Sequence, residues 1–477
     1  MEYETVIGLE VHAELAVKTK LFCSCSAEFG AEPNENVCPA CCGMPGSPAV
    51  LNKRAVELAI AASLLVNGEI TKMMTFDKKN YFYPDLPCGY QITQWFAPVC
   101  SGGGVEIKTG GGAKTITLKQ IHLEEDAGKL THDRRAGASL ADFNRAGVPL
   151  IEIVSNPDFR SAEEAVAYLE KLRSLLSFAG VSDCKMQEGS MRCDINISVR
   201  EKGSDKLGVR AEIKNMNSLK AISAAIEYES RRHIEALATG SEKLSQETRR
   251  WDDEAGETFA MREKEDATDY RYVPNPEVMP VEIGRDWINE IKNSMPETAD
   301  EKYARLTGGL GLSDYDAGII TGSKNLSEIF DGVLKYYDRP KETANWIITE
   351  LLSAAKGGNK GADDIKINCG NFAKLIRLVD NKTINRNVGK KILLSVLNDD
   401  ADPEQYAERH GLGMIGDEGV IGPAVREALA ENEKSVAEYK KGNRKVVGFL
   451  IGQVMRKLGG KADPKAVGEA LSKELGE

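Results

Sequence analysis

The chain has 477 residues, of which 42% are hydrophobic and 28% are charged. This length argues against a single core and predicts two or three domains, and the composition is that of an ordinary globular protein. The formal net charge of −11 argues against a protein that coats nucleic acid non-specifically, so any contact with RNA requires a local basic surface.

We expect a cytoplasmic protein that does not span a membrane. Residues 1–5 lack the basic and apolar regions of a secretory signal, and no apolar stretch approaches the ~20 residues of a membrane helix. Ten cysteines in such a chain favour metal ligands and buried thiols over disulfides.

Two strands with one polar face each are predicted in the N-terminal part of the chain. From residue 5 to residue 15 apolar and polar residues alternate, and Glu10 and His12 project from the polar face. The segment 192–200 shows the same alternation. Its polar face carries Arg192, Asp194, Asn196, Ser198 and Arg200.

Three amphipathic helices are predicted beside these strands. They begin after Asn52, after the capping box Ser161-x-x-Glu164, and near Ser218. From about residue 293 onward strand signals vanish while apolar residues keep helical spacing, and a break near residue 410 opens a short tail. The pattern predicts an α+β body, a helical middle and a small helical tail.

Four cysteines form two close pairs, Cys23-x-Cys25 and, after twelve intervening residues, Cys38-x-x-Cys41. Paired thiolates at this spacing in a turn-rich segment suit a tetrahedral Zn²⁺ site, and a complete Cys₄ set leaves no open position for a substrate. We therefore expect a structural zinc. The alternative is four buried free thiols. Cys42 competes with Cys41 as a ligand, but as its neighbour it should point elsewhere.

Carboxylates gather in two other predicted strands. Glu124-Glu125-Asp126 closes one strand, and Glu152 interrupts the apolar core of another. A carboxylate among apolar residues is costly unless it is paired, hydrogen-bonded or bound to a metal. With the polar face of the first strand, these residues fit an oxygen-rich Mg²⁺ site and a set of salt-bridged strand ends equally well, since Mg²⁺ sites have no fixed sequence pattern.

Basic and aromatic residues accompany these carboxylates. Arg192 shares a strand face with Asp194, Lys214 follows shortly after, and the run 270–272 reads Tyr-Arg-Tyr. Arginine and lysine beside carboxylates suit phosphate binding. By itself, however, the pattern favours a salt-bridged strand face.

A basic segment lies near the C-terminus. Between residues 434 and 465 nine basic residues stand against Glu438 and Asp463, an excess of seven in a chain whose net charge is −11. An apolar stripe that includes Leu450 and Val454 would pack the helix and leave the cations outward, as an RNA-binding surface or as a solvated face. The basic residues are Lys434, Lys440, Lys441, Arg444, Lys445, Arg456, Lys457, Lys461 and Lys465.

Longer runs around these residues resemble the B subunit family of the heterotrimeric amidotransferases that convert Glu-tRNA(Gln), and often Asp-tRNA(Asn), to the amide. The resemblance spans essentially the whole chain. The matching runs are GLEVH at 8–12, KNYFYPD at 79–85, HLEEDAGK at 122–129, DFNRAG at 142–147, IKNMNS at 213–218, QETR at 246–249, DYRY at 269–272 and GFLIGQVM at 448–455.

The resemblance implies three domains. A cradle-like α+β catalytic domain would cover residues 1–292 and include a zinc module at about 21–43. An all-α domain would cover 293–409, and a helical tRNA-binding tail would cover 410–477. The four cysteines match the zinc-containing branch of the family.

The family's chemistry is ATP-dependent phosphorylation of the side-chain carboxylate of misacylated tRNA, after which ammonia displaces phosphate. An amidase-type A subunit releases the ammonia from glutamine, and a small C subunit braces the assembly. Activation comes first because a carboxylate is a poor electrophile, and the phosphoryl transfer requires positioning and charge neutralisation. The chain has no local signature of a glutaminase nucleophile, which agrees with an external ammonia source.

Carried onto this chain, the family's catalytic residues are Glu10, His12, Glu125 and Glu152. Its Mg²⁺ ligands fall on His12, Glu125 and Glu152, with Glu10 and Glu124 near enough to share ligation or support it. Contacts to nucleotide or acyl phosphate fall on Lys79, Asn80, Tyr81, Arg192, Lys214 and Arg271.

Four positions depart from the family pattern. Cys88 replaces a usual lysine, Trp95 replaces a smaller aromatic residue, and Val273 and Asn275 replace phenylalanine and an acidic residue. Two rival functions are a non-catalytic RNA-binding protein with a zinc module and an ATP-dependent ligase that acts alone on a small acid. The buried-looking Glu152 favours an enzyme over a passive RNA binder, because RNA phosphates repel carboxylates.

Overall fold

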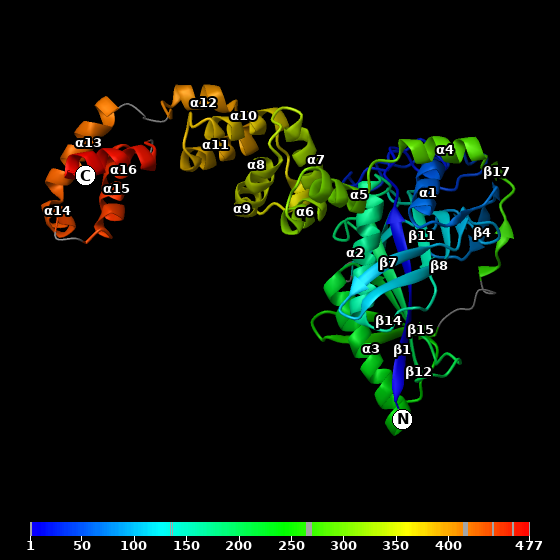
Figure 1. The fold of residues 1–477 in the computed structure, drawn as a ribbon. Helices are drawn as coiled ribbons and strands as arrows, with labels where there is room; N and C mark the ends of the chain where they lie inside the picture. The colour runs from blue at the N-terminus through cyan, green and yellow to red at the C-terminus, as the bar shows by residue number, and fades with distance from the viewer. Residues whose placement is uncertain are drawn as a thin grey trace. The chain divides into compact units, whose positions relative to one another are not determined.

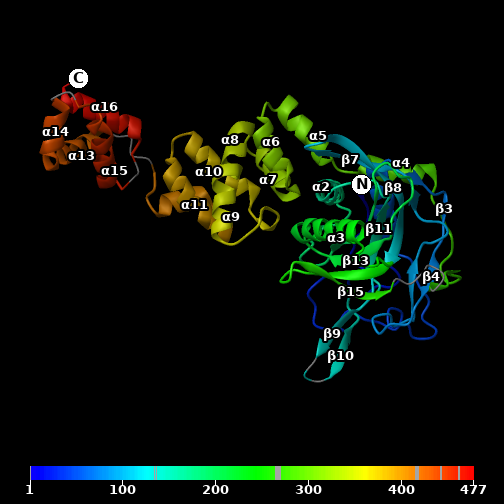
Figure 2. The same ribbon diagram turned by 90° about the horizontal axis from the view of Figure 1, so that it is seen from below.

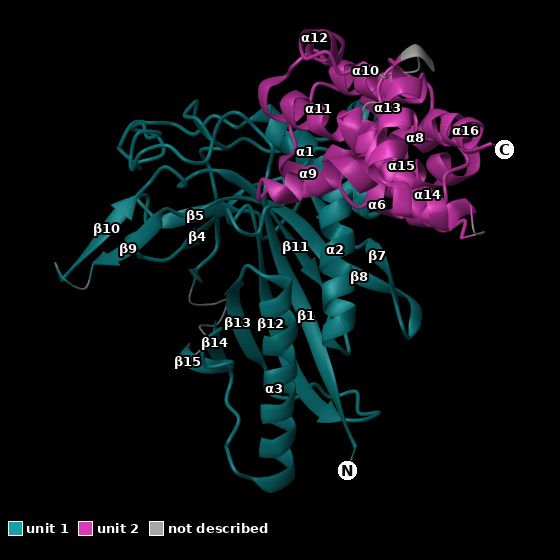
Figure 3. Cartoon of the chain, turned by 90° about the vertical axis from the view of Figure 1, so that its left-hand side faces the viewer, with its two compact units in different colours: residues 1–298 teal, residues 299–477 magenta. Residues whose placement is uncertain are grey.

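The computed structural model describes residues 2–133, 135, 137–263, 270–413, 418–440, 443–459 and 462–476 (Figure 1). Asp269 of the DYRY run and the basic residues Lys441 and Lys461 lie outside the described residues. The chain divides into two compact units, Met1–Thr298 and Ala299–Glu477 (Figure 3). The first is a mixed α/β unit and the second is helical, which confirms the predicted fold class.

Within the described residues, unit 1 is built on a ten-stranded sheet with the order β15-β14-β13-β12-β1-β11-β8-β6-β2, and β7 pairs with β8. Its strand pairs are antiparallel except for the parallel pair β13 and β14. The strands are β1 (Tyr3–Glu14), β2 (Glu69–Ile70), β6 (Cys100–Ser101), β7 (Gly104–Thr109), β8 (Gly112–Glu125), β11 (Pro149–Ser155), β12 (Met191–Glu201), β13 (Ala211–Met216), β14 (Glu247–Asp252) and β15 (Glu257–Glu263).

The predicted helices of unit 1 form where their caps indicated. The side chain of Asn52 caps α1 (Lys53–Leu65), Ser161 caps α2 (Ala162–Phe178) and Ser218 caps α3 (Leu219–Thr239). In the predicted capping box, the Ser161 side chain accepts from the backbone N–H of Glu164, as expected. The Glu164 carboxylate instead accepts from the backbone N–H of Arg160 and from Lys114.

The apolar face of the large sheet packs against these helices. Ile7, Leu9 and Val11 on β1 are buried in one core with apolar residues of α1, α2 and α3. Helices α2 and α3 lie on one face of the sheet (Figure 3). A fourth helix, α4 (Arg285–Ser294), packs against α1 near the end of the unit. The polar side chains of the central strands lie on the opposite face of the sheet.

Smaller sheets border that polar face. The order β16-β4-β5 joins β16 (Val273–Pro274), β4 (Asp77–Asn80) and β5 (Tyr90–Thr93), so segments almost 200 residues apart in sequence become neighbours. Strands β9 (Lys129–Asp133) and β10 (Ala138–Asp142) form a hairpin, and Figure 2 shows it projecting from the rest of unit 1. A third pair joins β3 (Met73–Met74) to β17 (Val281–Glu282).

The described residues of unit 2 form two separate hydrophobic cores, one from Leu306 to Ala407 and one from Ile421 to Leu471. No helix in the described part of the chain is both long and apolar enough to cross a membrane. The first core lies among α5 (Ala299–Ala304), α6 (Asp314–Thr321), α7 (Lys324–Leu334), α8 (Pro340–Asn345), α9 (Leu352–Gly357), α10 (Cys369–Asp380), α11 (Arg386–Asp399) and α12 (Pro403–Arg409). The second lies among α13 (Glu418–Glu431), α15 (Val446–Lys457) and α16 (Pro464–Leu475), and α14 (Glu433–Lys440) completes this part.

The separate second core predicts that α13 to α16 lose stability independently of unit 1. Leu450 is fully buried in this core, whereas its neighbour Phe449 is 49% exposed. Leu450→Ala should destabilise these helices by about 2–5 kcal/mol, and Phe449→Ala should have little effect. Hydrogen exchange should show faster exchange in α13 and α15 with unchanged protection of β1. Equal loss of protection in β1 would contradict independent stability.

Candidate active site and zinc centre

One face of the large sheet carries charged side chains on neighbouring strands. The register places His12 on β1 opposite Glu152 on β11 and opposite Arg192 on β12. Glu152 in turn lies opposite His122 on β8. Side chains at directly opposed positions share a face and lie close together. Antiparallel pairing therefore assembles a polar cluster from segments that are far apart in the sequence.

The centre of this cluster has two histidines and two glutamates. Nε2 of His12 lies 3.5 Å from Oε1 of Glu124 and 3.5 Å from Oε2 of Glu152. Nε2 of His122 lies 2.9 Å from Oε2 of Glu152 and 3.5 Å from Oε2 of Glu124. The Thr93 hydroxyl donates to Glu124 at 3.0 Å and fixes that carboxylate from β5.

This cluster fits a divalent cation. One ligand atom each of His12, Glu124 and Glu152 lies within 4.8 Å of the others, and carboxylate oxygens are the ligands that Mg²⁺ prefers. The described residues offer no hydrogen-bond partner to the buried Nδ1 of His12. We call His12, His122, Glu124 and Glu152 the cation cluster.

The carboxylates of the cation cluster favour the protonated form of its two histidines. Burial lowers the pKa of His122, but Glu152 and Glu124 together raise it to about 10. The pKa of His12 is also raised, because Glu152 and Glu124 outweigh burial. Burial acts to raise the pKa of Glu152, but the two histidines hold it well below its usual range. A bound metal ion would compete with these protons, because a ligating imidazole is neutral.

Glu125 does not belong to the cation cluster. Consecutive residues of a strand point to opposite faces, so Glu125 points away from Glu124, and its Oε1 accepts from the backbone N–H of Ile92 at 2.9 Å. Burial raises the pKa of Glu125 to about 7. The expected grouping of His12 and Glu152 with Glu125 is therefore not the one that the fold assembles, because Glu124 occupies that place.

Glu10 belongs to a second acidic group one step along the same face. Carboxylate oxygens of Glu10, Asp194 and Glu212 lie within 4.8 Å of one another. Lys214 lies between two of them, with Nζ at 3.3 Å from Asp194 and 3.5 Å from Glu212. Asn196 donates to Glu10 at 2.9 Å. These carboxylates already have a cationic partner in Lys214.

Arg192, near the start of β12, is held by a carboxylate. Its two terminal nitrogens contact the two oxygens of Asp126 at 2.9 and 2.8 Å, and Nε of Arg145 lies 3.6 Å from the same carboxylate. Burial opposes ionisation, but the two arginines keep the pKa of Asp126 below its usual range. The expected phosphate-binding residue Arg192 thus has a bidentate internal partner.

The four remaining expected nucleotide contacts come together beside β4. Nζ of Lys79 lies 4.7 Å from the ring centre of Tyr270 and 5.7 Å from that of Tyr81. The amide of Asn80 donates to the backbone carbonyl of Arg271 at 2.7 Å. The loop that carries Arg271 is therefore fixed against β4, although Arg271 itself is exposed.

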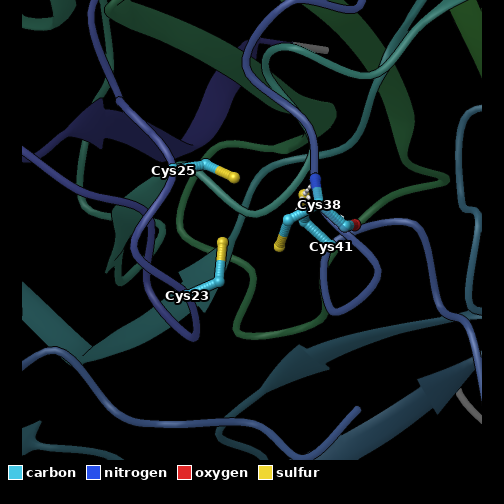
Figure 4. A group of neighbouring side chains, drawn as sticks. All are labelled: Cys23, Cys25, Cys38 and Cys41. Carbon is cyan, nitrogen blue, oxygen red and sulfur yellow. Dashed lines mark hydrogen bonds between the residues drawn. The ribbon is translucent and has the colours of Figure 1, made fainter.

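The four paired cysteines converge on one point (Figure 4). Sγ atoms of Cys23, Cys25, Cys38 and Cys41 all lie within 4.8 Å of one another, and those of Cys38 and Cys41 are 3.8 Å apart. Tetrahedral zinc with Zn–S bonds of about 2.3 Å requires sulfur atoms about 3.8 Å apart. The backbone N–H of Cys38 donates to Sγ of Cys41 at 3.1 Å. The set fits zinc, and Cys42 lies outside it.

A buried lysine supports this thiolate group. Lys20 has no exposed surface, and its Nζ donates to the carbonyl of Phe143 at 3.0 Å and to Sγ of Cys41 at 3.6 Å. The hydrogen bond with Cys23 and, to a smaller extent, the charge of Lys20 lower the pKa of Cys41 to about 4. The same hydrogen bond raises the pKa of the Cys23 thiol, so the charge of Lys20 is a separate contribution that favours a thiolate at Cys41.

A cavity of about 450 Å³ lies between the cysteine loop and the far side of β8. Lys20, Cys41, Cys88 and Glu125 all line it. Cys88, one of the departures from the family pattern, thus faces the same space as Glu125. Burial and the nearby Glu125 carboxylate raise the pKa of the Cys88 thiol to about 11.

Known proteins resemble this chain along nearly its whole length. Residues 5–289 match the model of the GatB/GatE catalytic domain, and residues 328–475 match that of the GatB domain. The B subunit of the aspartyl/glutamyl-tRNA(Asn/Gln) amidotransferase of Lachnoclostridium phytofermentans is 52% identical over 99% of both chains. The corresponding subunits of Agathobacter rectalis and Caldicellulosiruptor bescii are each 50% identical, over at least 99% of both chains.

The chain belongs to the GatB family. Its cation cluster and cysteine loop both lie within the stretch that matches the GatB/GatE catalytic domain. The basic residues of α14 and α15 lie within the stretch that matches the GatB domain.

Some residues of this GatB site were missed by sequence reasoning. His122 could have been found, because it stands two positions before Glu124 in the run HLEEDAGK and must share its strand face. Lys20 and Thr93 carry no such signal. Lys20 is a lysine with no exposed surface, and Thr93 reaches Glu124 from a separate sheet.

The geometry of the cysteine group predicts one tightly held zinc ion per chain. Cys38→Ser should lower both zinc content and thermal stability, because a structural zinc contributes directly to folding free energy. Metal analysis and thermal unfolding measure the two effects. Cys42→Ser is the matched control and should keep zinc at the wild-type level. Wild-type protein without zinc, purified without chelator, would rule out the site.

Proposed function

We propose that this chain is the amidotransferase subunit that activates and amidates the side-chain carboxylate of a misacylated tRNA. The substrates are Glu-tRNA(Gln), Asp-tRNA(Asn) or both, with ATP as phosphoryl donor. Full-length relatives at 50–52% identity carry the names of this enzyme. The observation that supports the chemistry is the cation cluster, bordered by Lys79 and its tyrosine partners.

The cation cluster suits phosphoryl transfer to a carboxylate. Mg²⁺ held by His12, Glu124 and Glu152 would neutralise phosphate oxygens and the attacking carboxylate, which otherwise repel each other. Lys79 and Arg271 add positive charge on the side of β4. Ammonia then displaces phosphate from the acyl phosphate, and the site must exclude water because water competes for the same carbon.

Arg192 and Lys214 frame the same face of the sheet. Each is held by a carboxylate, Asp126 for Arg192 and Asp194 for Lys214. We assign them to contacts with phosphate, since Arg192 lies opposite His12 and Lys214 pairs with Asp194, two residues along β12 from Arg192. Their internal partners keep them oriented before substrate arrives, which lowers the reorganisation needed during reaction.

Other subunits complete the reaction. The relatives are named as one subunit of an amidotransferase, and we assign glutamine hydrolysis to an amidase-type A subunit, with a small C subunit bracing a heterotrimer. The zinc of the cysteine loop is structural in this scheme. Because aminoacyl-tRNA is used in translation, we place the protein in the cytoplasm.

The cation cluster predicts that the two adjacent glutamates of β8 have different roles. Glu124→Gln should reduce tRNA-dependent phosphate release from ATP at least about 100-fold, since removing even a residue that supports a metal ligand indirectly costs about 10–100-fold. The reaction is measured in the assembled enzyme with ammonia supplied directly. The partner's hydrolysis of free glutamine should persist.

Glu125→Gln is the matched control for metal binding. Mn²⁺ titration followed by electron paramagnetic resonance should show weakened binding in Glu124→Gln and unchanged binding in Glu125→Gln. The opposite pattern would return the ligand role to Glu125. Amidation by Glu124→Gln at the wild-type rate would show that phosphorylation occurs elsewhere.

We further propose that α14, α15 and the segment between them contact tRNA phosphates. Lys440, Lys445 and Arg456 are exposed there. Lys457 differs, because its Nζ lies 3.1 Å from Glu427 and 2.7 Å from Glu431. We assign the phosphate contacts to Lys440, Lys445 and Arg456, whereas Lys457 already has two acidic partners.

Replacing Lys440, Lys445 and Arg456 together by Gln should raise the KM for misacylated tRNA. It should also flatten the dependence of log Kd on log salt by about 0.7 to 0.9 for each phosphate that the protein no longer neutralises. Arg456→Gln should have a larger effect than Lys457→Gln. Glutaminase activity without tRNA should not change. An unchanged salt slope in the triple variant would show that these cations only solvate the surface.

A further inference from the structure

Two aromatic rings are stacked at the edge of the polar face. Trp95 follows β5 and Tyr272 precedes β16, and their ring centres are 4.3 Å apart with an angle of 13° between the planes. Trp95 is nevertheless 44% exposed. A large apolar ring with one face stacked internally and much of its surface open can accept a further ring.

The backbone of Trp95 is held rigidly. Its N–H donates to Oδ2 of Asp77 at 2.7 Å, and the N–H of Phe96 donates to the same oxygen at 3.0 Å. Asp77 is only 1% exposed, so both hydrogen bonds are shielded from water. Trp95 is therefore preorganised rather than adaptable, which reduces the entropic cost of binding a planar ligand.

The segment that carries Trp95 also contacts the cation cluster, through Thr93. Thr93, two residues before Trp95, donates to Glu124 at 3.0 Å. On the other side, Tyr272 meets Tyr270 edge to face at 6.2 Å, and Nζ of Lys79 lies 4.7 Å from the Tyr270 ring. Burial, followed by the charges of Glu152 and Glu124, raises the pKa of Tyr272, in agreement with its position beside the carboxylates.

We infer that Trp95 is the stacking surface for the adenine ring of ATP, with the triphosphate directed past Tyr272 towards the cation cluster. This inference rests on the proposed function and assigns the nucleotide base to one residue. The arrangement combines a rigid aromatic surface, the ammonium group of Lys79 and a candidate cation site. All three belong to unit 1, on segments that are separate in the sequence. Those are the three chemical needs of a purine nucleoside triphosphate: stacking, charge neutralisation and a divalent cation.

The test is steady-state kinetics of the assembled amidotransferase at saturating Glu-tRNA(Gln). Trp95→Ala should raise the KM for ATP about tenfold, within the range expected for loss of one base–aromatic stack. Trp95→Phe should retain most of the affinity, and the KM for tRNA should not change in either variant. Phe96→Ala is the matched control, because Phe96 is 60% exposed and adjacent but has no stacked partner among the described residues.

Binding can be measured without catalysis. ADP should quench part of the tryptophan emission of the complex, and the quenched part should disappear in Trp95→Phe, which leaves Trp251, Trp287 and Trp346 as background. This titration separates the two proposals, since it does not depend on turnover. A wild-type complex without tRNA-dependent ATP hydrolysis would overturn the proposed function, while loss of ADP quenching in Trp95→Phe would still support the stacking surface.

Two results would overturn the inference. One is a KM for ATP in Trp95→Ala within twofold of wild type, together with full ADP quenching in Trp95→Phe. The other is a raised KM for Glu-tRNA(Gln) with an unchanged KM for ATP, which would assign the stacked pair to the terminal adenosine of the tRNA instead of the nucleotide.

Discussion

Antiparallel pairing of β1 with β11 and β12 places His12 opposite Glu152 on one side and Arg192 on the other. The pairing of β11 with β8 then sets His122 opposite Glu152. A slip of one residue in any of these pairs would turn the polar side chains towards the core and apolar ones towards solvent. The apolar residues of β1 are almost completely buried beneath the helices, so packing on one face holds the register that the site needs on the other.

A face with this many carboxylates is tolerated because several of them lie beside a basic group. Asp126 pairs with Arg192, Asp194 with Lys214, and Glu152 with the two imidazoles. Breaking such a buried pair leaves an uncompensated charge, which is strongly destabilising. The same groups that compensate one another in the folded protein are the ones that a metal ion and phosphates would engage. The same charged groups therefore contribute to the stability of the fold and to the proposed chemistry.

The cysteine loop is connected to this face through the backbone. The N–H of Leu21, at the start of the loop, donates to the carbonyl of Gly147, whose own N–H donates to the carbonyl of Asp126. Farther along, the Asn34 N–H donates to the Asp142 carboxylate at the foot of the projecting hairpin. A zinc ion that closes the loop would thus stabilise the residues that follow β8, including Asp126, although the zinc site is not part of the cation cluster.

The sequence by itself determined the division into an α+β part and a helical part, the caps at Asn52, Ser161 and Ser218, the polar face of β1 and the cysteine spacing. These features are local, since they follow from hydrophobic periodicity and short-range hydrogen bonds. Only the tertiary structure places Glu124, rather than Glu125, beside His12 and Glu152, because two adjacent glutamates at a strand end look alike in sequence and only the pairing register assigns each to a face. For the same reason Thr93 and the stacked Trp95 and Tyr272 carried no local signal, since contacts across separate sheets depend on how those sheets pack.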